Sequence, residues 1–200
     1  MNWLVFFLGA WVTMGLQLGL RDGLALGPTA VAPSFALIYL VFVALSAPKR
    51  TALWAGLVIG LLLDLTRALP SADAQSVVTV IGPMTLGGAL AAYAVVQVRG
   101  VLYQRNPLTA PVVTAIAVFL AHLVAIATLE LRSWYDPAVD ISALGDVARA
   151  ALIAVYSAAV MFVVNLLLRP ALPALATLFA FDATPSAWRW GYGRRGSLHR

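Results

Sequence analysis

Cysteine is absent from this chain, and histidine and charged residues are scarce. Without cysteine there is no disulfide framework, no thiolate metal site and no cysteine nucleophile. The two histidines, His122 and His199, do not make a metal cluster on their own. Charged residues make up 10% of the sequence and hydrophobic residues 62%. That balance leaves too little polar surface for an ordinary soluble domain.

Motifs that carry catalysis or bind cofactors are missing as well. The chain has no Gly-rich phosphate-binding loop and no Gly-x-Ser-x-Gly nucleophile elbow. No segment between apolar runs is long enough to fold as a separate catalytic domain. The sequence therefore predicts a protein that is not an enzyme and that needs no cofactor.

Long apolar runs dominate the chain instead. A bilayer core of about 30 Å needs about 20 helical residues, and six runs approach or exceed that length. We therefore expect an all-α integral membrane protein with six transmembrane helices in one bundle over residues 1–169, followed by a tail over 170–200. Pro83 is expected to kink the fourth helix. The runs cover residues 3–20, 29–47, 51–69, 76–98, 108–131 and 144–168.

Basic residues sort by loop and thereby predict the topology. The second and fourth loops and the tail together hold nine Lys and Arg residues, whereas the other loops hold one Arg each. By the positive-inside rule the nine-residue side is cytoplasmic, and both termini lie inside. Topology thus accounts for the basic pI, and no nucleic-acid partner is expected. The nine are Lys49, Arg50, Arg99, Arg105, Arg169, Arg189, Arg194, Arg195 and Arg200.

Asp64 is an acidic residue inside an apolar run. A carboxylate at the centre of a membrane helix costs about 2.5–3.5 kcal/mol on insertion scales, so it should face protein or water. Ala52, Gly56 and Gly60 precede it at intervals of four and form a small-residue stripe that lets another helix approach closely. Two interpretations remain open: a buried polar anchor or ligand contact, or a carboxylate near the outer interface that pairs with Arg67.

Other polar groups enter the apolar runs at similar depths. His122 lies about as deep as Asp64, so a hydrogen bond between them is geometrically possible, but a neutral histidine bonded to a backbone carbonyl is favoured. Glu130 and Arg149 lie near the outer ends of their runs, where they can reach the interface and pair across helices. A second small-residue stripe, expected to pack helices, consists of Ala150, Ala154 and Ala158.

Aromatic and basic residues alternate near the C-terminus. This mixture suits membrane lipids with anionic headgroups, or an acidic cytoplasmic partner. The alternative is a disordered end adsorbed to the membrane. The residues are Trp188, Arg189, Trp190, Arg194 and Arg195.

Two segments resemble the rod shape-determining protein MreD family. Gly56–Leu65 reads Gly-Leu-Val-Ile-Gly-Leu-Leu-Leu-Asp-Leu, similar to the Gly-rich helix ending in an aspartate that this family carries. Gly82–Arg99, a small-residue helix with Gly87 and Gly88 that ends at a basic loop, also fits. The segment after Asp64 departs from the family, which usually continues with a Gly-containing turn.

The resemblance implies a non-enzymatic scaffold of the bacterial cell-wall elongation machinery in the inner membrane. Its expected partners are an MreC-like scaffold protein, a RodA-type glycosyltransferase, a class B penicillin-binding protein and the MreB cytoskeleton. The family fold is similar to the substrate-binding membrane subunits of energy-coupling-factor transporters. The alternative function is therefore a vitamin-type small-molecule binding subunit, with a cavity lined by Asp64, His122, Glu130 and Trp134.

Overall fold

Six helices and one short ladder make up the described part of this computed structural model, which covers residues 2–27, 31–67, 69–70, 77–100, 108–134, 143–168 and 178. Strand β1 (Leu69–Pro70) pairs antiparallel with β2 (Val77–Val78), with Leu69 opposite Val78. The expected all-helical character is confirmed apart from this ladder. The helices are α1 (Trp3–Gly19), α2 (Phe35–Ser46), α3 (Lys49–Thr66), α4 (Pro83–Val98), α5 (Thr109–Ser133) and α6 (Ala143–Leu168).

Helices α2 and α4 begin later than the sequence predicts. Helix α2 starts at Phe35, directly after Pro33 and Ser34, and residues 31–34 have no regular structure. Helix α4 starts at Pro83, with Gly82 before it at a φ of 127°, a conformation that suits glycine. The predicted kink at Pro83 is therefore wrong: in the first turn its missing N–H breaks no helical hydrogen bond.

Two described helices are long and apolar enough to cross a membrane, namely α5 over Thr109–Ser133 and α6 over Leu144–Leu167. Helices α1, α2 and α4 have 17, 12 and 16 residues. Helix α3 has 18 residues, but they include Lys49, Arg50 and Asp64. Length and composition thus indicate membrane-crossing helices, and the six-span arrangement stays a prediction.

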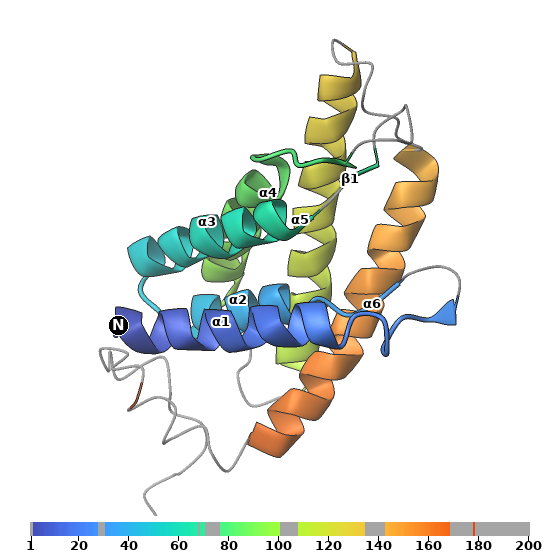
Figure 1. The fold of residues 1–200 in the computed structure, drawn as a ribbon. Helices are drawn as coiled ribbons and strands as arrows, with labels where there is room; N and C mark the ends of the chain where they lie inside the picture. The colour runs from blue at the N-terminus through green and yellow to red at the C-terminus, as the bar shows by residue number, and fades with distance from the viewer. Residues whose placement is uncertain are drawn as a thin grey trace, which may run out of the picture.

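Helix α2 lies at the centre of the fold and packs against all five other helices. Nine of its twelve residues are buried. The surrounding helices are not parallel: Figure 1 shows α1 and α3 running across the view, whereas α5 and α6 rise steeply past them. Consecutive helices α3, α4, α5 and α6 also pack against one another in chain order.

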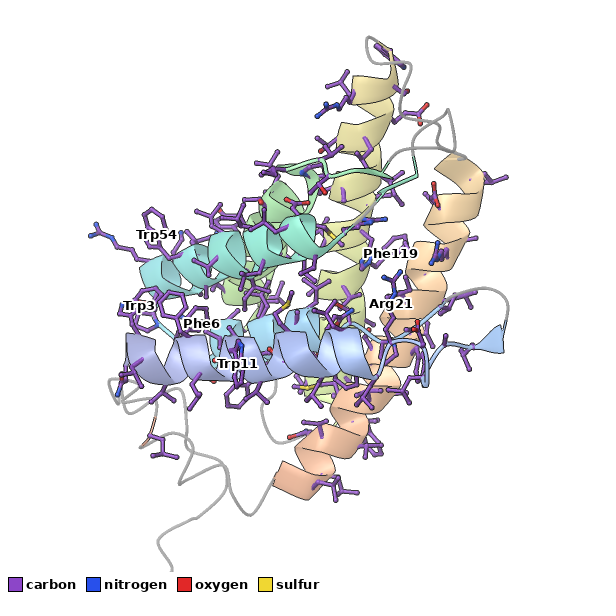
Figure 2. All side chains as sticks on the ribbon, in the orientation of Figure 1. Trp3, Phe6, Trp11, Arg21, Trp54 and Phe119 are labelled. Atoms are coloured by element: carbon purple, nitrogen blue, oxygen red, sulfur yellow. The ribbon has the colours of Figure 1, made fainter. Side chains whose placement is uncertain are left out.

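Aromatic contacts attach α1 to the central helix. The rings of Phe6 and Tyr39 stack with their centroids 5.9 Å apart, and the Tyr39 hydroxyl donates a hydrogen bond of 3.0 Å to the Phe6 carbonyl. Phe6 is fully buried, and Trp3 packs edge-on against it (Figure 2). A Cβ atom at Gly9 would lie 2.5 Å from the Tyr39 hydroxyl, so the absence of a side chain there admits the tyrosine ring.

Candidate functional site

Glycines bring the backbones of α3 and α4 into direct contact. A Cβ atom at Gly56 would lie 2.6 Å from the Gly88 carbonyl oxygen, and one at Gly88 would lie 2.6 Å from the Gly56 carbonyl oxygen. A Cβ at Gly60 would lie 2.7 Å from the Thr85 Cα. We call Gly56, Gly60 and Gly88 the glycine seam. The stripe that includes the fully buried Ala52 therefore meets a helix of the same chain.

The opposite face of α4 is equally close to α5. A Cβ at Gly87 would collide with the Ala121 carbonyl and lie 3.2 Å from the Ala121 Cα. Small residues on both faces thus hold α4 between α3 and α5 with no side-chain layer between the backbones. Close backbone approach of this kind is how small residues pack helices where burial from water gives little driving force.

Asp64 closes the end of the glycine seam by capping α4. One carboxylate oxygen, Oδ2, accepts hydrogen bonds from the Gly82 N–H at 2.9 Å and the Thr85 N–H at 2.8 Å. The same oxygen accepts from the Thr85 hydroxyl at 2.7 Å, and Oδ1 accepts from the Met84 N–H at 2.9 Å. Asp64 is 2% exposed. We call this carboxylate with its four donors the Asp64 cap.

The Asp64 cap satisfies the hydrogen-bonding groups of both the first turn of α4 and the buried carboxylate. The first N–H groups of a helix have no partner within it, and the N-cap residue Gly82 has no side chain to satisfy them. Pro83 has no N–H, so the N–H groups of Met84 and Thr85 are the ones exposed in the first turn. A buried carboxylate needs several donors, and the positive end of the helix dipole favours a negative charge there. The structure thus places Asp64 as a buried polar anchor.

His122 has a different partner. Its Nδ1 lies 2.9 Å from the carbonyl oxygen of Val118, one turn earlier in α5. Because a carbonyl only accepts, Nδ1 must carry the proton in this contact, and in the neutral ring Nε2 is then an acceptor. This is the backbone-bonded histidine that the sequence favoured over a bond to Asp64.

A cavity of about 350 Å³ lies where the ends of α1 and α3 meet α5 and α6. Apolar residues such as Leu63, Met84 and Ile126 form part of its lining. The polar part of the lining consists of Gln17, Arg21, Ser34, Thr66, Arg67, His122, Asp146 and Arg149.

Three arginines give the cavity its electrostatic character. Arg67 and Arg149 are partly buried, and Arg21 is exposed between the end of α1 and α6 (Figure 2). Arg67 follows the last residue of α3. All three side chains line the same cavity.

The remaining predicted residues are spread over the end of α5, over α6 and over the tail. Glu130 is partly buried near the end of α5, where its backbone carbonyl accepts from the Ser133 hydroxyl at 2.7 Å, and it does not line the cavity. Trp134 is 79% exposed. Ala150 and Ala154 are buried and Ala158 is partly buried on α6, which packs mainly on α5. The tail residues Trp188, Arg189, Trp190, Arg194 and Arg195 lie outside the described residues.

Sequence reasoning missed the two residues that fix the ends of α2. The Ser157 hydroxyl of α6, fully buried, accepts a hydrogen bond of 3.0 Å from the Ser34 N–H at the start of α2. Arg99 follows α4, and its Nη1 donates to the Ala44 carbonyl at 3.0 Å and to the Ala47 carbonyl at the end of α2. A cation at a helix C-terminus also complements the dipole. No signal in the sequence marked these contacts, because the predicted run over 29–47 did not show that α2 is a twelve-residue helix without a side-chain cap of its own.

Among the residues described, no group of three or more His, Asp or Glu side chains is arranged to hold a metal ion. The chemistry of this region is therefore that of a helix cap next to a basic cavity.

Comparison of the chain with protein-family models, with curated proteins and with solved structures gives no match.

Proposed function

We propose that this chain is a non-enzymatic membrane scaffold of the bacterial cell-wall elongation machinery, similar to MreD, and that it crosses the inner membrane six times. The observation that carries the proposal is where the resembling residues lie. Gly56–Leu65 and Gly82–Arg99 contain the glycine seam and the Asp64 cap. A family-like pattern concentrated in helix packing, rather than in reactive side chains, is what a scaffold requires.

The internal use of the glycine seam changes where partners are expected to bind. Gly56 and Gly60 are covered by α4, so they are not free to contact another protein. Partner contacts would then involve outward apolar faces, such as the side of α1 with Leu4 and Trp11, which are 74% and 75% exposed. The partners implied by the resemblance are the MreC-like scaffold, the RodA-type glycosyltransferase, the class B penicillin-binding protein and MreB.

The proposal is tested by crosslinking the tagged protein in its own membranes and identifying what co-purifies by mass spectrometry. We expect the MreC-like scaffold or wall-elongation enzymes. Gly60→Ala, which forces α3 and α4 apart, should reduce this recovery, whereas Gly100→Ala is the matched control because a Cβ there meets nothing within 4 Å. Recovery of a transport ATPase with its coupling subunit would overturn the scaffold proposal.

The cavity favours one second candidate, a small-molecule binding subunit. Its volume of about 350 Å³ lies at the lower end of the range typical of ligand sites. Of the four residues expected to line such a site, only His122 lines the cavity. The charged part of the lining consists of three arginines and Asp146 instead. Thermal stabilisation by a vitamin, together with recovery of an ATPase module, would support this candidate; no stabilisation across a vitamin panel would count against it.

A further inference from the structure

The arginines around the cavity come from three separate parts of the chain. Arg21 follows α1, Arg67 follows α3 and Arg149 belongs to the second turn of α6. Asp146 is the one acidic residue in the lining formed by the described residues. Bringing like charges together in a partly buried space is unfavourable, because they repel and lose hydration. An arrangement of this kind gains most when a negative group enters it.

We propose that this cavity binds an anionic group, a phosphate or a carboxylate, between Arg67 and Arg149, with Arg21 at the exposed edge. The planar guanidinium group presents paired N–H donors that match the oxygens of phosphate and carboxylate. The Gln17 amide and the His122 ring supply further polar groups in the same lining. The apolar lining from Leu63 and Ile126 leaves room for the uncharged part of such a ligand.

Two sources share this chemistry. By the predicted topology the ends of α1 and α3 lie on the outer side of the membrane, where a phospholipid headgroup can supply the phosphate. A small soluble phosphate or carboxylate compound carries the same group. The chemistry of the site is common to both, so the experiment separates them with two probes.

Binding is measured on the purified full-length protein. Inorganic phosphate is titrated against protein in a neutral detergent, and the midpoint of thermal unfolding is followed. In the second arm, native mass spectrometry compares protein from nanodiscs of phosphatidylglycerol with protein from nanodiscs of phosphatidylcholine. Arg67→Gln and Arg149→Gln each remove one guanidinium group, and Arg50→Gln is the control because Arg50 is exposed at the other end of α3.

We expect stabilisation by phosphate, or retained phosphatidylglycerol, in the wild type and in Arg50→Gln. Each cavity variant should weaken binding roughly tenfold or more, as expected for the loss of a charge-assisted hydrogen bond. Asp146→Asn should strengthen binding, because it removes the one carboxylate of the described lining; damage to the fold does not raise affinity. Stabilisation by phosphate without retained phosphatidylglycerol identifies a soluble ligand, and retained phosphatidylglycerol identifies a lipid.

The proposal is overturned if neither probe binds the wild type more tightly than Arg67→Gln, or if Asp146→Asn weakens binding as much as the arginine variants do. Because the purified protein carries no partners, this result does not depend on the scaffold function. A scaffold that co-purifies with elongation proteins but binds no anion would refute this inference alone.

Discussion

Thr85 bonds to the Asp64 carboxylate through both its backbone and its side chain. Its N–H lies 2.8 Å and its hydroxyl 2.7 Å from the same oxygen, Oδ2. These two contacts join the end of α3 to the first turn of α4. Together with the glycine seam, these contacts join α3 and α4 into one packed unit.

Asp64→Asn should destabilise the fold by about 1–3 kcal/mol, the usual cost of leaving buried polar groups unsatisfied. The amide replaces one accepting oxygen by an NH₂ donor, which then faces donors of Gly82, Met84 or Thr85. Thermal unfolding in detergent, followed by tryptophan fluorescence, measures the change. Asp22→Asn is the control because Asp22 is exposed; equal melting points for the two variants would refute the Asp64 cap.

Gly60→Ala should destabilise the protein by about 1–3 kcal/mol, as overpacking generally does. The new Cβ would lie 2.7 Å from the Thr85 Cα, and backbone cannot move aside as a flexible side chain can. Gly15→Ala, in open space, should be neutral or slightly stabilising because alanine favours helix more than glycine. If chemical denaturation ranks the two variants in the reverse order, the close contact of α3 and α4 at the glycine seam is refuted.

Arg99→Gln should lower stability by about 1.5–3 kcal/mol, since hydrogen bonds to charged groups contribute on this scale. The change removes the guanidinium that reaches the Ala44 and Ala47 carbonyls at the end of α2. Arg50→Gln removes the same charge from the same predicted side of the membrane at an exposed position. A loss of stability of the same size in both variants would mean that Arg99 contributes only as a positive charge on that side of the membrane, and not through its hydrogen bonds to α2.

Single cysteines test the predicted orientation, because the chain contains none of its own. Gly23→Cys and Gly100→Cys sit at exposed positions and change no charge. In intact spheroplasts a membrane-impermeant maleimide should label position 23, and position 100 only after lysis. Labelling in the opposite pattern would invert the topology, and labelling of both in intact cells would contradict it.

Much of the fold follows from hydropathy. Helices α1, α3, α5 and α6 begin and end within about three residues of the predicted limits, because apolar runs bounded by polar residues define them. The start of α4 was misjudged because Val77–Ile81 is as apolar as the helix itself, while the helix begins only at Pro83.

The site was predictable only in part. The cost of burying a carboxylate singled out Asp64, and the intervals of four residues singled out Gly56 and Gly60. The donors that reach Asp64 are mainly backbone N–H groups, which leave no mark in the sequence. The arginine lining of the cavity was missed because Arg67 and Arg149 each look like interfacial residues, and only the tertiary fold brings them together.

The proposed scaffold function is tested most directly by site-specific photo-crosslinking in living cells. A photoreactive phenylalanine derivative replaces Trp11 on α1 or Trp54 on α3, which are 75% and 60% exposed and point outward in Figure 2. We expect at least one position to form a light-dependent adduct that mass spectrometry identifies as the MreC-like scaffold or a wall-elongation enzyme. Adducts with a transport ATPase or its coupling subunit, or with lipid alone at both positions, would contradict the account.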